Sequence, residues 1–336
     1  MKRTLVTAVT LGALALAACS DSSLDPTELG GNAQADDRED MLQVLEASGF
    51  FADVFGTDGA QPGAPAGAGA FASPMAVEGE VPLPHAWGRH HKRPVRRLIT
   101  IEVDDLEGVA TVTKEVVFEG EFVFDLLADD GFNPVRKAMN HTLIQHARFE
   151  RIPDDLQDHP DQPKPDEPQP SPQEGDGRDH GRKWSLVSVS PAQWVMTDEE
   201  KQSVWIELIE IWVDEELCTV IEDPNELFEV DTRVPRLEVG QVVTVKAWVG
   251  GGTTGNVPEF YVFLHMFHAS PDTRIWMRRQ MEAVEGDLGV YYTRSWEVLF
   301  PGRERIAVDA IDSQSFVESD AEDYAANAWG IPYVIQ

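Results

Sequence analysis

The chain has 336 residues, 42% of them hydrophobic, and a formal net charge of −32 at pH 7. This acidity argues against a nucleic-acid partner, because phosphate contacts need clustered lysines and arginines. Two cysteines are too few for a disulfide scaffold. The length is typical of about two domains, each able to bury a core.

The N-terminus predicts a secretory signal. Met1-Lys2-Arg3 is followed by an uncharged, mostly apolar run from Leu5 to Ala18, which is too short to span a bilayer. The run ends in Leu16-Ala17-Ala18-Cys19, which resembles the bacterial lipobox. The resemblance implies that residues 1–18 are a signal peptide and that Cys19 is acylated, with the lipid bilayer as its partner. The alternative is an ordinary signal whose cleavage site adjoins a cysteine.

The lipobox predicts a lasting attachment to the cell envelope, since two or more acyl chains anchor a protein stably. Aspartate directly after the acylated cysteine resembles the enterobacterial signal for retention in the inner membrane. Here Ser20 takes that position and Asp21 follows, which favours the outer membrane, on its periplasmic or its surface side. Beyond the N-terminus, no apolar run approaches the ~20 residues of a spanning helix.

Residues 19–35 are small and polar and are interpreted as a tether. A helix is predicted within 36–55, with Asp36 as its N-cap and Glu39 three residues later. Its buried face would carry Met41, Leu45 and Ser48. Gly49 either ends this helix or weakens it.

Three segments have unusual compositions. Residues 59–76 are nearly all Ala, Gly and Pro and predict a low-complexity linker. Residues 153–183 have seven prolines in their first twenty positions and predict a disordered acidic insertion, because proline cannot donate to a sheet. Residues 81–100 contain basic residues and no acid, and are interpreted as a linker. The basic side chains and histidines are His85, Arg89, His90, His91, Lys92, Arg93, Arg96 and Arg97.

Period-two alternation begins at Leu98 and predicts antiparallel strands with one buried face. Ile99, Ile101 and Val103 share a face. The next strand places Val116, Phe118, Phe122 and Phe124 opposite Glu115, Glu119, Glu121 and Asp125. Gly120 interrupts the apolar row, which indicates a bulge or a close backbone approach. Third and fourth strands are predicted over 138–152 and 184–190.

A second set of strands follows residue 200. The predicted ranges are 203–213, 241–249, 259–268, 273–280, 290–300 and 305–312. Turns such as Gly250-Gly251-Gly252 and Pro301-Gly302 separate them, and this spacing is typical of a sandwich. Tyr261-Val262-Phe263-Leu264 is apolar on both faces, so that strand should be central. The predicted fold class is mostly β.

The segment Trp184-Ser185-Leu186-Val187-Ser188-Val189-Ser190-Pro191 completes a pattern of helix, long hairpin and final strand. This pattern over 36–198 resembles the SnoaL-like, nuclear-transport-factor-like cone fold, which implies a curved α+β sheet around a pocket. Only one of the helices that normally close the cone is present. Residues 203–336 resemble bacterial immunoglobulin-like domains through 234–240 and 301–310. They lack the Cys…Trp…Cys core and the tyrosine corner. The ending 327–333 is similar to uncharacterised two-part envelope lipoproteins.

The histidine pairs His141/His146 and His265/His268 have odd spacings, which place the members of each pair on opposite faces of a strand. Neither is therefore predicted to bind a metal. His85, His90 and His91 could hold a transition metal in a flexible segment, but a solvated linker is favoured. Asp125, Asp129 and Asp130-Gly131 could hold Ca²⁺. Their spacing does not match the EF-hand loop, so a polar turn is favoured.

The carboxylates Glu207, Glu210, Asp214, Glu215 and Glu216 could perform acid/base chemistry if they were buried. A solvated face is favoured. Cys218 has acidic neighbours, which would raise its pKa, and it is predicted to be a small core residue. No catalytic, cofactor-binding or metal-binding residue is assigned, and Cys19 is the one predicted modification site.

The leading hypothesis is a non-enzymatic envelope lipoprotein with a protein or polymer partner. The alternative is a small-ligand carrier or a pocket enzyme of isomerase or hydrolase type on the cone-like region. An apolar cavity within 98–190, with His141 or His146 beside a carboxylate, would favour that alternative, whereas a filled core would exclude it. The basic residues of 85–97 either neutralise the acidic face of the Phe-rich hairpin or contact anionic lipid. We favour the first use.

Overall fold

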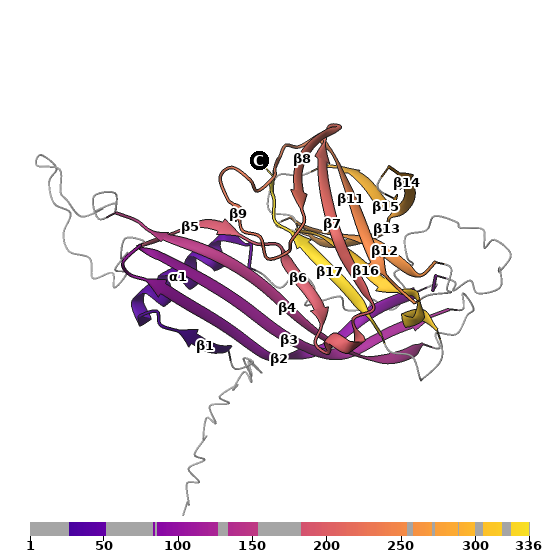
Figure 1. The fold of residues 1–336 in the computed structure, drawn as a ribbon, viewed down its shortest axis with the longest axis horizontal. Coiled ribbons are helices and arrows are strands. Elements are labelled where there is room, and N and C mark those ends of the chain that lie inside the picture. The colour runs from indigo at the N-terminus through magenta and orange to yellow at the C-terminus, as the bar shows by residue number, and fades with distance from the viewer. Residues whose placement is uncertain are drawn as a thin grey trace, which may run out of the picture.

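The computed structural model describes residues 27–51, 83–84, 86–126, 134–153, 183–253, 258–270, 273–287, 289–299, 305–317 and 324–335 (Figure 1). These residues are mostly in strands, which confirms the predicted class. The signal peptide, Cys19, the linker 59–76 and residues 154–182 of the predicted insertion lie outside the described residues.

Eleven strands form the larger sheet, in the order β1-β2-β3-β4-β6-β17-β16-β12-β13, with β5 paired to β4 and β9 paired to β5. Their bounds are β1 (Thr27–Gly31), β2 (Ala86–Asp104), β3 (Val109–Asp125), β4 (Val135–Arg151), β5 (Trp184–Val189), β6 (Ala192–Met196), β9 (Phe228–Glu229), β12 (Phe260–Ser270), β13 (Thr273–Gln280), β16 (Arg305–Asp312) and β17 (Ala326–Ile331). β6 pairs with β17, so strands from before and after the predicted domain boundary at 198–203 share one sheet. That boundary does not divide the fold.

A second sheet has five strands in the order β14-β15-β11-β7-β8. They are β7 (Val204–Val213), β8 (Glu216–Ile221), β11 (Val242–Gly251), β14 (Glu282–Gly286) and β15 (Gly289–Glu297). β7 crosses β16 and β17, so the two sheets form layers there (Figure 1). β10 (Arg236–Leu237) and β18 (Val334–Ile335) make a short parallel pair. Two short 3₁₀ turns, η1 (Glu199–Lys201) and η2 (Ser313–Phe316), complete the described elements.

The alternation seen in the sequence builds the inner face of the larger sheet. Val116, Phe118, Phe122 and Phe124 of β3 are each at most 1% exposed. The pairing of β2 with β3 shifts register between His91 and Arg93, beside Gly120. An irregularity at Gly120 is thus confirmed, but the extra residue lies on β2. β12 is central between β13 and β16, as predicted.

The helix α1 (Ala35–Ser48) covers one end of this inner face, where Met41 and Leu45 are buried. Gly49 ends the helix with a φ of 71°, a left-handed conformation that glycine adopts without strain. The predicted Asp36 cap is wrong: the helix begins at Ala35, after Gln34. The acidic residues of the helix serve another purpose, since Asp40 accepts hydrogen bonds from the backbone N–H groups of residues 183 and 184.

Two segments predicted to be tether or linker are strands. β1 lies within the predicted tether 19–35 and pairs in parallel with β2, and the Asn32 side chain then bonds to both backbone groups of Val103. Residues 86–100 of the basic segment form most of β2, and β2 pairs with β3 along its whole length. In both places, backbone pairing with a neighbouring strand outweighs a polar composition that predicted loop.

Candidate functional site

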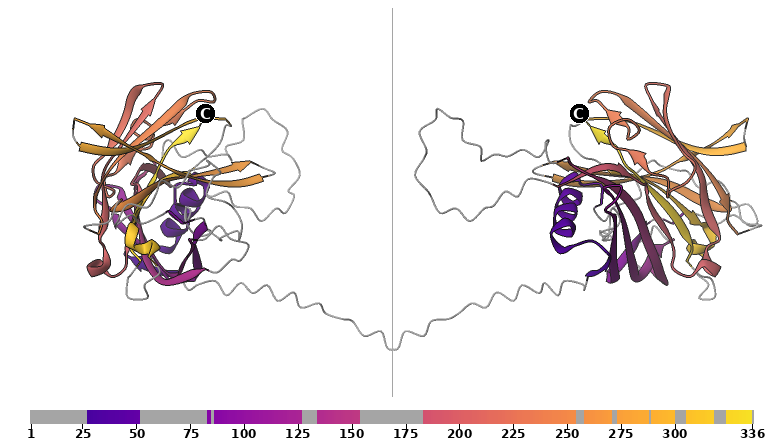
Figure 2. Two further views of the ribbon diagram at one scale, coloured as in Figure 1. Left: turned by 90° about the vertical axis from the view of Figure 1, so that its right-hand side faces the viewer. Right: turned by 60° about the vertical axis from the view of Figure 1, so that its left-hand side comes forward.

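Side chains from distant strands of the larger sheet meet inside its curl. The Trp87 ring of β2 lies 4.9 Å from the Phe263 ring of β12, measured between centroids. Arg278 of β13 donates a hydrogen bond to the Trp87 carbonyl oxygen at 2.9 Å. Figure 2 shows the two further views in which this curl can be followed. The sheet thus curls so that β2, near one edge, packs against β12 and β13 at the other.

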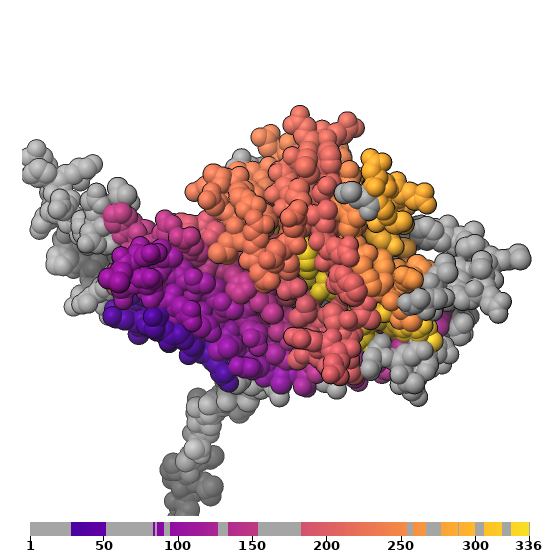
Figure 3. Space-filling view, in the orientation of Figure 1, coloured from indigo at the N-terminus to yellow at the C-terminus, as the bar shows by residue number. Residues whose placement is uncertain are grey.

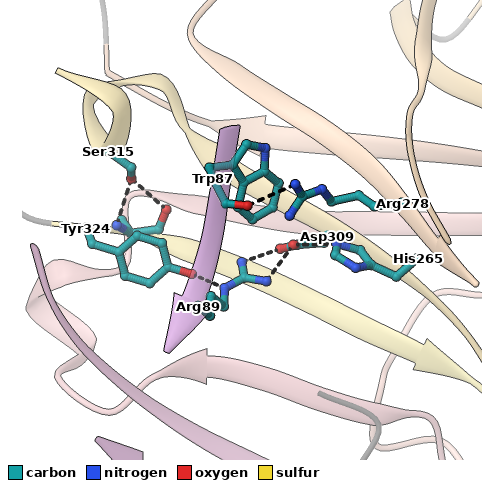
Figure 4. Close-up of polar contacts among 8 residues, drawn as sticks. Trp87, Arg89, His265, Arg278, Asp309, Ser315 and Tyr324 are labelled. Atoms are coloured by element: carbon teal, nitrogen blue, oxygen red, sulfur yellow. Dashed lines mark hydrogen bonds and ion pairs between the residues drawn. The ribbon is translucent and has the colours of Figure 1, made fainter. Parts of the chain in front are cut away.

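A three-residue ion cluster lies between strands of this curled sheet (Figure 4). Nη1 and Nη2 of Arg89 donate to the two carboxylate oxygens of Asp309 at 2.7 and 2.8 Å. Nε2 of His265 lies 2.9 Å from Oδ2 of Asp309. The three residues come from β2, β16 and β12. They are 2%, 0% and 2% exposed for Arg89, Asp309 and His265 respectively.

Aromatic rings surround the cluster. Nε of Arg89 donates to the Tyr324 hydroxyl at 2.5 Å, and the Tyr324 ring stacks on Phe122 at 4.5 Å. The guanidinium group of Arg278 lies 3.6 Å from the centroid of the Trp87 ring. Ser315 fixes the chain beside Tyr324, because its hydroxyl bonds to both backbone groups of the next residue, Ala325. The contacts with Tyr324 and Asp309 hold the Arg89 side chain in one orientation.

The electrostatics of the cluster favour an ionised Asp309. Burial by itself would raise the pKa of this carboxyl group, but the charge of Arg89 and the hydrogen bonds from His265 and Arg89 outweigh it and lower the pKa well below its ordinary value. An ionised carboxylate only accepts hydrogen bonds, so Nε2 of His265 must carry a proton. The cluster therefore joins three strands by charge-assisted bonds.

The structure places His141 and His146 on opposite faces of β4. His141 is 2% exposed on the inner face of β4, where its ring lies against Tyr324 and Trp194. His146 is on the other face, and its Nδ1 lies 3.1 Å from the Thr113 hydroxyl. His265 meets Asp309, and the side chain of His268 lies outside the described residues. The predicted placement of His141 and His146 on opposite faces of a strand is confirmed.

The remaining candidate residues differ in their surroundings, and several lie outside the described residues. His90 is exposed on β2, and the side chains of His85 and His91 lie outside the described residues. Asp125 is 5% exposed, while Asp129 and Asp130 are not described. Asp214 and Glu215 form a tight two-residue turn between β7 and β8, with φ values of 49° and 71°. Among the described residues, no cluster of three or more His, Cys, Asp or Glu could hold a metal ion.

The prediction that Cys218 is a core residue is wrong. It is exposed on the edge strand β8, where the pairing with β7 shifts register between Ile211 and Trp212. The part of the side chain that its neighbours cover raises the pKa of the thiol through desolvation. Cys218 lines a surface hollow of about 270 Å³, together with Thr219 and residues 232–236.

Sequence reasoning missed the ion cluster, although one signal was present. Asp309 interrupts the otherwise apolar run Ile306-Ala307-Val308-Asp309-Ala310-Ile311. A charge in a strand that is apolar on both faces needs a buried partner. Nothing in the sequence indicated that Arg89, 220 positions earlier, supplies it.

Comparisons with protein-family models, curated proteins and solved structures found no match to this chain. Within the part of the chain that the structure describes, there is no helix with the length and apolar character needed to cross a membrane. The assignment of a function therefore depends on the geometry and the sequence motifs.

Proposed function

We propose that this protein is a lipoprotein of the bacterial cell envelope, anchored through acylated Cys19, and that it acts as a non-enzymatic binding or structural module. The basic N-terminal segment, the apolar run and the lipobox support the anchor. The residue after Cys19 favours the outer membrane.

One observation carries the proposal for the folded part. The inner face of the larger sheet, where the resemblance to the cone fold places a pocket, is filled by packed side chains. Phe118 stacks on Trp194 at 4.9 Å in the middle of this face, and the charged groups beyond it are at most 3% exposed. Around the Asp309–His265 pair, Arg89 and the rings of Trp87 and Tyr324 pack closely. The arrangement favours a rigid module over a carrier or a pocket enzyme.

The short connection to the anchor fits this role. Seven residues, 20–26, separate Cys19 from β1. Even a fully extended chain of this length spans no more than ~28 Å. The edge of the larger sheet at β1 would then stay close to the bilayer, while the five-stranded sheet lies on another side of the molecule (Figure 1).

Metabolic labelling with a fatty-acid analogue tests the anchor. The wild-type chain should be labelled and sediment with membranes, and Cys19→Ser should lose the label because it removes the only thiol of the lipobox. Cys218→Ser is the matched control and should keep the label. Equal labelling of Cys19→Ser and the wild type would overturn the proposal that Cys19 is acylated.

Native mass spectrometry of the chain purified from membranes tests the closed interior. The expected mass is that of the processed chain with its acyl groups. A further small molecule that copurifies in stoichiometric amount, and is lost on unfolding, would favour the carrier and contradict the module.

A further inference from the structure

The five-stranded sheet has one buried and one outward face. Val243, Val245 and Ala247 of β11 are fully buried against the larger sheet. Their neighbours Thr244, Lys246 and Trp248 must therefore face outward. We use the name aromatic face for the outward surface formed by Trp205, Glu207, Glu210, Trp212, Lys246, Trp248 and Tyr291. Residues of this sheet form the upper part of the surface in Figure 3.

Trp205 lies at one end of the aromatic face and is 46% exposed. It pairs across the strands with Gly250. A Cβ atom on Gly250 would lie 2.7 Å from Nε1 of Trp205, and one on Gly251 would lie 2.7 Å from Cζ3. The indole therefore rests directly on glycine backbone, which only glycine permits. The glycine backbone covers one part of the Trp205 ring, and the other part is open to solvent.

Charged groups separate and orient the rings. Nε1 of Trp205 donates to Glu207 at 3.2 Å, and Nε1 of Trp212 donates to Glu210 at 2.8 Å. Nζ of Lys246 lies 3.9 Å from the centroid of the Trp212 ring. Each tryptophan at the two ends of the face is thus fixed by a carboxylate on its own strand.

The middle of the aromatic face holds a pair of rings. Trp248 and Tyr291 lie 5.3 Å apart between centroids, and Nζ of Lys246 lies 5.5 Å from the Tyr291 ring. From Thr244 to Gly250 the face extends ~20 Å along β11, at ~3.4 Å per residue. Aromatic rings, carboxylates and one amine are distributed over this whole length.

This composition suits a chain of sugars. The C–H face of a sugar ring packs on an aromatic ring, while its hydroxyl groups bond to carboxylates and amines at the ring edges. We propose that the aromatic face binds a polysaccharide of uncharged sugar units, several of which would lie along it. This inference rests on the proposed function, because it names the partner class of the same module.

Charge selects this partner over others. The aromatic face and the outward side of the adjacent strand β14 carry Glu207, Glu210 and Glu282 against Lys246, and the chain as a whole is strongly acidic. Nucleic acid, anionic lipid and acidic polysaccharide would be repelled. The centre of a protein interface is depleted of charge, whereas here carboxylates lie between the rings. An uncharged polymer rich in hydroxyl groups is not repelled by the negative charge, and its hydroxyl groups can bond to the carboxylates between the rings.

Retention on insoluble cellulose and chitin tests the proposal, with heparin beads as the anionic control. The full chain is used in a detergent without a sugar headgroup, so that the detergent does not compete. We expect retention on at least one uncharged polymer and none on heparin. The double variant Trp205→Ala/Trp212→Ala should bind about tenfold more weakly or worse, and Trp205→Phe/Trp212→Phe should recover much of the affinity because the rings remain.

Leu106→Ala is the matched control, since Leu106 is 99% exposed at the turn between β2 and β3. It should bind as the wild type does. Thermal unfolding confirms that each variant is folded, and the ring-preserving variant gives a second comparison if the alanine variant is not. No retention of the wild type on either uncharged polymer overturns the proposal, as does undiminished retention of the folded alanine variant.

A protein partner would give a different result. Retention on an envelope fraction that protease abolishes, and that glycan hydrolysis leaves intact, would overturn the polysaccharide proposal. The fatty-acid labelling of Cys19 is a separate measurement. A failure of sugar binding and a failure of the anchor are therefore distinguishable.

Discussion

The interior of the curled sheet and the aromatic face use the same side-chain types in opposite surroundings. Inside, Arg89 and Asp309 pair beneath Trp87 with almost no exposure. Outside, Lys246 and Glu210 flank Trp212 on a surface open to water. The first arrangement connects three strands and is almost completely buried. The second ties only neighbouring strands and leaves ring surface exposed.

This difference indicates where stability and binding are located. A buried ion pair contributes little beyond an apolar pair of the same shape, but breaking it leaves an unpaired charge in a medium of low polarity. An exposed pair is screened by water and can be altered at small cost. Substitutions inside should therefore change stability, and substitutions outside should change binding.

The largest effect is expected for Asp309→Asn. The amide cannot neutralise Arg89, so we expect a loss of about 3–5 kcal/mol in the free energy of unfolding. Urea denaturation followed by circular dichroism measures it. Glu210→Gln is the matched change on the aromatic face and should cost less than about 1 kcal/mol. Equal effects of the two substitutions would contradict the comparison.

Removing both partners should restore stability. In Arg89→Met/Asp309→Leu no charge is left unpaired, and apolar side chains of related shape fill the space. We expect the double variant to unfold at a higher urea concentration than Asp309→Asn alone. A double variant that is less stable than the single one would mean that the hydrogen bonds of Arg89 to Tyr324 and Asp309 contribute more than the charge balance.

Acid should lower the free energy of unfolding, because protonation of Asp309 removes its charge beside Arg89. Its folded pKa lies below the ordinary value of 3.8, so its contribution is present above about pH 4 and is lost as the pH falls toward the folded pKa. The stability difference between the wild type and Asp309→Asn should therefore shrink on acidification from pH 5 to pH 2. A difference that stays constant over this range would show that Asp309 does not titrate with unfolding.

Much of the fold could be predicted from the sequence because a strand with one buried face alternates apolar and polar residues. The strands around Phe118, Val262 and Val308 follow from alternation or from apolar runs, and Gly49 ended the helix as a glycine can. β17 and β6 could not be predicted to pair, since a contact between residues more than a hundred positions apart leaves no local pattern. The division into two domains depended on that missing pairing.

The site was harder to predict for a physical reason. The basic composition of β2 indicated a loop, but pairing with β3 and the buried partner of Arg89 reverse that indication. Cys218 was placed in the core by its residue type alone, whereas its position on an edge strand exposes it. The aromatic face consists of side chains from three strands whose register only the structure supplies.

A smaller effect on stability is expected for Trp212→Ala. Its ring is partly exposed, and its contacts are with Lys246 and Glu210 on the surface. We expect a loss of about 1 kcal/mol, from a cation–π contact and an exposed hydrogen bond. Thermal unfolding gives the measurement, with Trp212→Phe retaining the larger part. A loss comparable to that of Asp309→Asn would make the ring structural and remove the basis for a binding surface.

The smallest effect is expected for Arg96→Gln, which compares two arginines of one strand. Arg89 and Arg96 both lie on β2, but the Arg96 side chain is 49% exposed and meets Glu28 and Glu115 at 3.8 Å each. Screening by water reduces such a pair to about 0.5 kcal/mol or less, and added salt should reduce it further. Urea denaturation at low and high salt measures this. A loss at low salt that disappears at high salt supports neutralisation of the hairpin by the basic segment. If stability is unchanged while binding to anionic vesicles weakens, the basic segment instead contacts lipid, close to where β1 leads toward Cys19.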